Sequence, residues 1–291
     1  MGIRDIGKNI TNLLPSRADK TAGAGKKGNS LPPARVDKTA VIGKGVTMEP
    51  GVIVQKNAVI GDNAVLKKGA LVEAGAQVGK GSVVGKRSRI GNKAKVRDRV
   101  LISEESQVRE LSEIGSGSSL GPRVKIGPES WLGENTKVGE GTAVGREAEL
   151  ENGVEIGSQA RVGDDVNIGE NTKVGNKTYI GDHSLIDDET VIGKDVNLEE
   201  RVYIGSGVKV GDGSDLETGS QIRDFAALGE GVHIEEDAEV GSQARIGDYA
   251  DVGNDASVED RAVVEEMGDV PDGEIFFSGE TPKNGEPHRG D

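Results

Sequence analysis

The feature that most constrains this chain is an aliphatic residue at every sixth position over most of its length. From Val36 to Val270, 40 successive positions spaced by six residues hold Val, Ile, Leu or Met. Two residues before each aliphatic, from Ala40 to Ala262, every position holds Ala, Val, Ser or Thr. A period of 3.6 residues would indicate a helix, and a period of two an ordinary strand. The period of six therefore predicts a short strand followed by a tight corner in every unit.

The residues between the aliphatics are typical of corners. The residue after the aliphatic is Gly at 23 of the 38 positions from Gly43 to Glu265. Two residues further on, the sequence favours Gly, Asn and Asp, which tolerate a positive φ. Three units close a triangular coil of 18 residues, and such coils stack through parallel backbone hydrogen bonds roughly 4.8 Å apart. We therefore expect an all-β fold, a parallel β-helix of about 13 coils over residues 36–270.

The expected core consists of three aliphatic columns without aromatic side chains. The chain has three Phe, three Tyr and one Trp, which are too few for a core built around large rings. Hydrophobic residues make up 34% of the chain and charged residues 30%, a composition that would favour disorder without a regular pattern. Like residues pack on like within a column, and one column is expected to contain Ile42, Ile60, Val78, Val96, Ile114 and Leu132.

The absence of cysteine and of long apolar stretches excludes several classes of protein. With no Cys, the chain has no disulfide scaffold, no zinc-thiolate site and no catalytic thiol. No stretch approaches 18 consecutive apolar residues, and residues 1–14 mix charges with aliphatics. Neither a membrane span nor a secretory signal is therefore expected, and a cytoplasmic location is predicted.

The segments outside the repeat have separate expected roles. Residues 1–35 are expected to form an amphipathic anchoring helix followed by a flexible linker. The helix is expected either to cap the open first coil or to dock to a partner or a membrane surface. Residues 271–291 are expected to form a C-terminal cap and a polar tail, with Phe276 and Phe277 closing the bottom of the core. The apolar stripe of the predicted helix consists of Ile3, Ile6, Ile10, Leu13 and Leu14.

The outward positions, immediately before each large aliphatic, are unexpectedly apolar in the first coils. Val65, Val83 and Leu101 are separated from one another by three repeat units and are expected to stack on one outer face. An apolar strip on an outer face usually marks contact with another chain, so we expect a homotrimer or a longer polymer. Further candidates for such contacts are Ile53, Leu71 and Trp131.

Charge is distributed unevenly along the chain. Residues 1–100 carry 20 Lys and Arg against 7 Asp and Glu, a net charge of +13, whereas residues 101–291 carry 16 against 43, a net charge of −27. Because sequence order equals axial order in a β-helix, this predicts a basic end and an acidic end. We expect the basic end and the anchoring helix to engage an anionic membrane surface, which would make the protein peripheral to a membrane, or an acidic protein partner. Nucleic acid is not expected as a partner, since the net-acidic body would repel it.

Residues 36–270 resemble the hexapeptide-repeat superfamily, whose members fold as a left-handed parallel β-helix. The left-handed crossover is implied by this resemblance alone, because parallel strands in general favour right-handed connections. The segment Asp269–Ile275, followed by Gly279, Pro282 and Lys283, resembles the closing segment of bacterial hexapeptide acyltransferases. It departs from that segment by one extra residue before the proline and by the lack of an alanine after it.

The resemblance implies one enzymatic function. Most members transfer acyl groups from coenzyme A or a carrier protein, with a histidine as general base at a cleft between trimer subunits. The chain has three histidines: His288 lies in the polar tail, and the candidates are His183 at a corner and His233 at an outward strand position. These two are expected about 13 Å apart along the axis, too far to serve one site in one subunit. No metal site is expected, because a γ-type carbonic anhydrase would need three clustered histidines.

We interpret the chain as a non-catalytic structural or scaffold rod that acts in assembly or anchoring and uses no cofactor. This interpretation depends on the absence of any insertion that breaks the six-residue register between Val36 and Val270 and could wall a substrate cleft. The alternative is an O- or N-acyltransferase that depends on acyl-coenzyme A or an acyl carrier. A pocket between subunits that contains a histidine would favour the enzyme.

Overall fold

The computed structural model describes residues 31–277, and every strand in it is two residues long. The first strand is β1 (Arg35–Val36), each following strand begins six residues later, and the last is β41 (Ile275–Phe276). The first residue of a strand faces outward, and in β1 to β40 the second is the aliphatic residue of the repeat. No helix occurs among residues 31–277. The anchoring helix expected within residues 1–35 falls outside the described residues.

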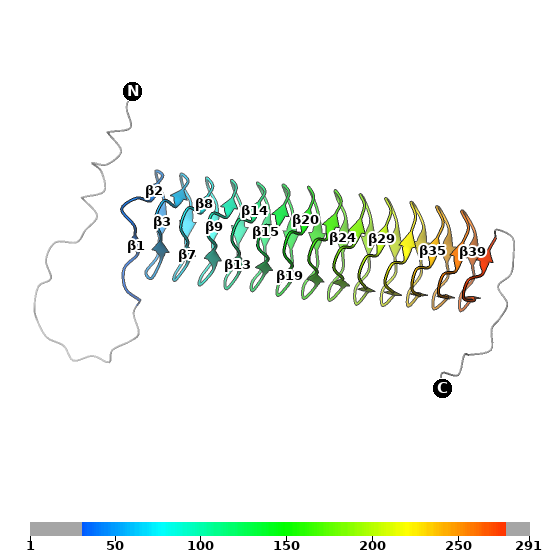
Figure 1. Ribbon diagram of the computed structural model, residues 1–291. Helices are drawn as coiled ribbons and strands as arrows, with labels where there is room; N and C mark the ends of the chain where they lie inside the picture. Colours follow the sequence, from blue (N-terminus) through cyan, green and yellow to red (C-terminus); the bar gives the residue numbers. More distant parts are fainter. Residues whose placement is uncertain (1–30, 278–291) are drawn as a thin grey trace, which may run out of the picture. The chain divides into compact units, whose positions relative to one another are not determined.

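Every third strand belongs to the same sheet, so the strands form three parallel sheets that wind into stacked coils (Figure 1). Partner strands are always three repeat units apart, without a shift of register, as in the pairing of Val36 with Val54. The expected all-β parallel β-helix is confirmed. Sheet A runs from β1 to β40 (Asp269–Val270), sheet B from β2 (Val41–Ile42) to β41, and sheet C from β3 (Thr47–Met48) to β39 (Val263–Val264).

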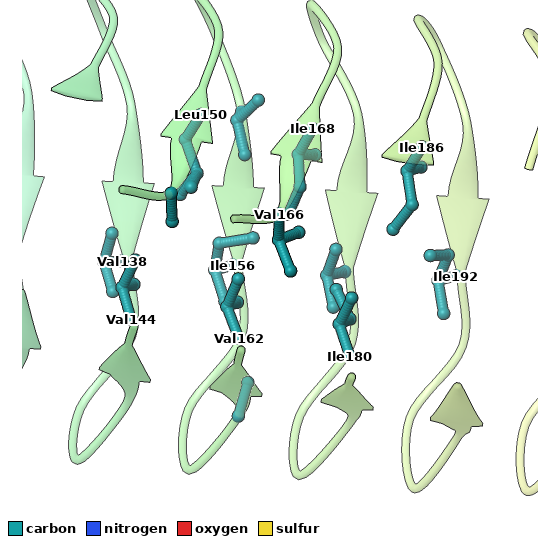
Figure 2. Packing of buried hydrophobic residues seen from close by; sticks show 14 of the residues in the cluster. Val138, Val144, Leu150, Ile156, Val162, Val166, Ile168, Ile180, Ile186 and Ile192 are labelled. Carbon is teal, nitrogen blue, oxygen red and sulfur yellow. The ribbon is translucent and has the colours of Figure 1, made fainter. Parts of the chain in front are cut away.

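The aliphatic columns of the sequence form the core. Figure 2 shows the side chains of Val138, Leu150 and Ile156 lying inside the coils. From Val54 to Val270 the aliphatic residue of every unit is at most 4% exposed, which contributes about 1.5–3 kcal/mol for each such side chain. The expected column is formed within sheet B by the successive pairing of Ile42, Ile60, Val78, Val96, Ile114 and Leu132.

Serine and threonine at the small inward position are also hydrogen-bonded to the next coil. There are 14 such buried residues among those the structure describes, and in 13 of them the hydroxyl donates to the backbone carbonyl 15 residues later. Ser112, for example, donates to the carbonyl of Gly127 at 2.6 Å. The exception is Ser220, whose buried Oγ has no hydrogen-bond partner. Polar residues are tolerated inside because the ladder satisfies them.

Glycine after the aliphatic, as at Gly127, allows neighbouring coils to approach closely. A Cβ at Gly127 would lie 2.0 Å from the carbonyl oxygen of Gly145. Gly127 does not have a positive φ, and the left-handed conformation belongs to the residue two positions later. That corner residue adopts it even when it is Leu111 or Phe225, with φ of 61° and 59°. The stacking of coils therefore imposes a conformation that these side chains disfavour by about 1–2 kcal/mol.

The residue two positions after the aliphatic, immediately before the left-handed residue, links successive coils when it is Asp or Asn. In 12 cases its Oδ1 accepts a hydrogen bond from the backbone N–H of the residue 18 positions earlier. Asp182 accepts from Asp164 at 2.8 Å, and Asp164 accepts in turn from Arg146 at 2.7 Å. We call this contact the corner staple. It satisfies corner N–H groups that would otherwise have no backbone partner.

The two ends of the described rod differ. Phe276 is 6% exposed and covers the core of the last coil. Phe277, expected to close the core with it, is instead 49% exposed, because alternate residues of an extended segment point in opposite directions. At the other end Val36 is 43% exposed and Ile42 is only partly buried, so the core of the first coil is uncovered among residues 31–277.

The corner staple is expected to contribute to stability through its acceptor oxygen. Asp182→Ala removes the acceptor for the Asp164 N–H and should lower the free energy of unfolding by about 1 kcal/mol. Asp182→Asn keeps an Oδ1 acceptor and should lose less than half of that. Urea unfolding followed by circular dichroism measures both variants, and an equal loss in the two would contradict the staple.

Candidate functional site

The outer faces carry the candidate interaction residues, because side chains fill the interior of the rod. In sheet C, the strands β6 (Val65–Leu66), β9 (Val83–Val84) and β12 (Leu101–Ile102) pair in register and stack Val65, Val83 and Leu101 on one face. Leu101 is 47% exposed, while Val65 and Val83 are half-buried by their neighbours. These three residues form a continuous apolar surface, which we call the apolar strip.

The other candidate contact residues lie on different faces. Ile53 and Leu71 pair in sheet A, whereas Trp131 lies in sheet B between Glu113 and Glu149 and is half-buried. The six candidates are therefore spread over all three faces. A shallow groove of about 380 Å³ adjoins Leu101 on sheet C and is lined by Lys67, Gly85, Lys86, Ile102, Ser103, Glu104 and Pro122.

Opposite charges on neighbouring rungs pair along the faces. The Nζ of Lys137 lies 2.7 Å from Oε1 of Glu155, one rung away in sheet C. The hydrogen bond from Lys137 lowers the pKa of Glu155. Both side chains are largely exposed, so such pairs contribute little individually.

The structure does not bring the two candidate histidines together. His183 is a corner residue that follows β25 (Tyr179–Ile180), and its Nδ1 lies 3.4 Å from Oδ2 of Asp165. His233 begins β34 (His233–Ile234), nine strands and so three coils further along. Four grooves on the described surface have linings that include neither histidine. His288 lies outside the described residues.

His233 lies among carboxylates on the outer face of sheet A. Its Nε2 is 3.0 Å from Oε1 of Glu217, and its Nδ1 is 3.3 Å from Oδ1 of Asp251 and 4.0 Å from Oε1 of Glu235. Burial lowers the pKa of His233, but Glu217, Asp251 and Glu235 together raise it above its ordinary value. Burial raises the pKa of the Asp251 carboxyl. The contact between Asp251 and His233 lacks hydrogen-bond geometry, which leaves the solvent-shielded Oδ1 of Asp251 without a hydrogen bond.

Three of these residues could contribute metal ligands. His233, Glu235 and Asp251 each present one ligand atom within 4.8 Å of the others, and imidazole with carboxylates suits a divalent transition metal. Both ring nitrogens already face carboxylates, so an ion-pair network accounts for the arrangement without a metal. This group was not anticipated from the sequence, although His233 and Asp251 lie three repeat units apart and so offered a signal.

A groove of about 740 Å³ lies over sheet C in the acidic half of the chain. Phe225 is 62% exposed and forms one side, where Gly207 leaves room for it: a Cβ on Gly207 would lie 2.6 Å from the ring. Lys209 and Arg245 form no ion pair within residues 31–277, and Arg261 donates from Nε to Oε1 of Gln243 at 3.2 Å. We call this feature the basic groove; its lining consists of Glu189, Gly207, Lys209, Phe225, Ala226, Ala227, Gln243, Arg245, Arg261 and Val263.

None of the residues that the structure describes forms a helix with the length and apolarity needed to cross a membrane.

Comparison with known families accounts for the repeat. The model of the GMPPB C-terminal domain matches residues 30–114. The model of the hexapeptide repeat of succinyl-transferase matches residues 123–158 and 189–223, within the stacked coils described above. In these two segments the chain has the hexapeptide repeat that this family model describes. Curated protein sequences give no significant match.

Solved structures of acyltransferases resemble this hexapeptide-repeat chain. The UDP-N-acetylglucosamine acyltransferase of Francisella novicida is 25% identical with a TM-score of 0.54, over 57% of this chain and 67% of that one. The UDP-N-acetylglucosamine acyltransferase of Bacteroides fragilis is 21% identical with a TM-score of 0.28, over 64% of this chain and 66% of that one. The chain thus spans about two thirds of the length of these structures. The first likeness supports the fold, and the activity of those proteins is not thereby transferred to this chain.

The pKa of His233 is expected to lie above its ordinary value, since three carboxylates stabilise the charged form of the ring. Glu217→Gln removes the carboxylate nearest to Nε2 and should lower that pKa. Glu236→Gln, at the neighbouring corner, should leave it unchanged. NMR titration of the imidazole signals measures all three proteins, and equal pKa values in the Glu217 variant and the unmodified chain would refute the network.

Proposed function

We propose that this chain is a non-catalytic structural rod whose outer faces hold copies of it together. The observation that carries the proposal is the uninterrupted six-residue spacing of the strands from β1 to β41. An acyltransferase needs walls that enclose its acceptor, and within residues 35–276 no insertion leaves the rod to form one. The described surface offers shallow grooves between rungs, a form suited to contact with another surface.

The apolar strip supports self-association. Three exposed or half-buried aliphatics on consecutive rungs form a surface that water solvates poorly, and a second copy can cover it. Ile53 and Leu71 give sheet A a matching apolar patch at the same end. Contact between two different faces of parallel copies forms a closed ring, such as a homotrimer, when the rotation between copies closes, and an open polymer when it does not.

The basic end supports an anchoring role for the assembly. Lys67 and Lys86 lie beside the apolar strip, and the net charge of +13 over residues 1–100 favours attachment to an anionic membrane surface or an acidic protein. Exposed charges are screened over about 8 Å at physiological ionic strength, so such an attachment weakens with salt. Co-sedimentation with anionic vesicles at low and high salt separates the membrane from the protein partner.

Self-association is expected to depend on the apolar strip. Val83→Glu places a charge between Val65 and Leu101 and should shift the protein toward monomers, because a buried unpaired charge is costly. Gln77→Glu, on the exposed face of sheet B in the same coil, adds the same charge and should have little effect. Multi-angle light scattering at micromolar concentration measures the mass. A monomeric unmodified protein would sink the proposal.

An acyltransferase is the second candidate function. It is favoured by the likeness to the Francisella novicida enzyme and by the contact of His183 with Asp165, since a carboxylate on one ring nitrogen leaves the other free to accept a proton. In this function His183 or His233 would face a cleft completed by a second copy.

Acetyl-coenzyme A is expected not to bind specifically to the unmodified protein, because neither histidine lines the basic groove or the groove beside Leu101. Isothermal titration calorimetry tests this directly. A dissociation constant in the micromolar range that is lost in His183→Ala or His233→Ala would reverse the order of the two candidate functions.

A further inference from the structure

Two columns of outward residues in the acidic half carry opposite charges at the same spacing. On sheet C, β30 (Lys209–Val210), β33 (Ala227–Leu228) and β36 (Arg245–Ile246) pair in register and place Ala227 between Lys209 and Arg245. On sheet A, β31 (Asp215–Leu216), β34 and β37 (Asp251–Val252) place His233 between Asp215 and Asp251. We call the second set the acidic column.

The cations of the basic groove have no carboxylate partner in the described part of their own chain. Residues 101–291 hold 43 Asp and Glu against 16 Lys and Arg, and some of these cations do pair with a carboxylate. Lys194, for example, pairs with Asp212 at 3.1 Å. Lys209 and Arg245 are exposed yet form no ion pair within residues 31–277, and their neighbours on the face are Val191, Ala227 and Val263. Apolar residues beside an unpaired Arg are typical of a contact surface.

The acidic column, with Glu217 and Glu235 at the corners beside it, has more carboxylates than cations. Among residues 31–277, His233 is the only cationic side chain within 4.0 Å of Glu217, Glu235 and Asp251. Asp215 accepts a hydrogen bond from the neutral Asn197 at 2.8 Å and has no ion-pair partner among the described residues. The column therefore keeps negative charge that no group in the described part of its own chain neutralises.

We propose that the basic groove of one copy receives the acidic column of a second copy of this chain. Lys209 then faces Asp215 of the other copy, Arg245 faces Asp251, and the ring of His233 enters the space above Ala227. This inference rests on the proposed function, self-assembly of the rod, and names the two faces that meet.

The spacing of the charges fits this contact. Lys209 and Arg245 lie two rungs apart on sheet C, and Asp215 and Asp251 lie two rungs apart on sheet A. With roughly 4.8 Å per rung, the charges are equally spaced on the two faces. Each strand of sheet C is followed six residues later by a strand of sheet A in the next side of the coil. Parallel copies therefore present the two columns at nearly the same axial level.

Other rungs support the same pairing of faces in the same orientation. Parallel contact of sheet C with sheet A brings Glu155 opposite Arg161, and Val65 opposite Leu71. Contact of sheet C with sheet B would instead bring Glu155 opposite Glu149, which is unfavourable between like charges. At the rung of Glu155 the sheet A face is thus the better partner.

Charge reversal tests the contact in three variants of the full chain. Lys209→Glu with Arg245→Glu, and separately Asp215→Lys with Asp251→Lys, should each weaken self-association about tenfold or more. All four substitutions in one chain restore opposite charges across the contact and should return the affinity to near that of the unmodified protein. Arg109→Glu with Arg201→Glu, at the corners between sheets A and B, makes the same change of net charge as the first pair and should have little effect.

Sedimentation velocity at low salt measures association, and circular dichroism verifies that each variant keeps the β-helix. If the unmodified protein assembles and neither double variant weakens it, the named contact is wrong while assembly stands. If both double variants weaken it and the fourfold variant does not recover, the two columns do not face each other. If the unmodified protein is a monomer, the proposed function itself fails.

Discussion

The structure depends on the stacking of one coil on the next through parallel backbone hydrogen bonds at a constant offset of three repeat units. Because no register shift or insertion occurs from β1 to β41, each residue lies over the residue at the same position of the repeat in the previous coil. Close approach at the corners then requires glycine at positions such as Gly127, and a left-handed conformation two residues later. The core columns, the hydroxyl ladder and the corner staple all follow from this repetition.

The same constraint determines what the surface can do. A solenoid without loops presents side chains only in straight columns, one residue per rung, so any recognition has to be built along a face. The apolar strip and the basic groove occupy the two ends of sheet C, and their counterparts occupy sheet A at the same levels. Such a face, with its side chains in evenly spaced columns, suits contact with another copy, whose columns have the same spacing.

The repeat alone predicted the all-β parallel β-helix and the aliphatic columns, because a period of six with one large and one small inward residue has few other solutions. The stacking of Val65, Val83 and Leu101 follows from their spacing. The corner staple was not anticipated, since it depends on how an Asp such as Asp182 lies beneath an N–H of the previous coil. The basic groove was also missed, because the position of Phe225 depends on the missing Cβ of Gly207. The expected burial of Phe277 was wrong for a local reason, the alternation of an extended segment.

Disulfide cross-linking tests most directly whether the faces of sheets A and C meet between copies. The chain has no cysteine, so introduced cysteines report only on their own contacts. In a chain with Ala227→Cys and His233→Cys, mild oxidation should join copies covalently, because the two positions face each other across the contact and come within disulfide reach. Chains with only one of the two substitutions should remain uncrosslinked, since neither position meets itself when two different faces are in contact. Cross-linking by a single cysteine as efficiently as by the pair, or none in the pair while the protein is assembled, would contradict the account.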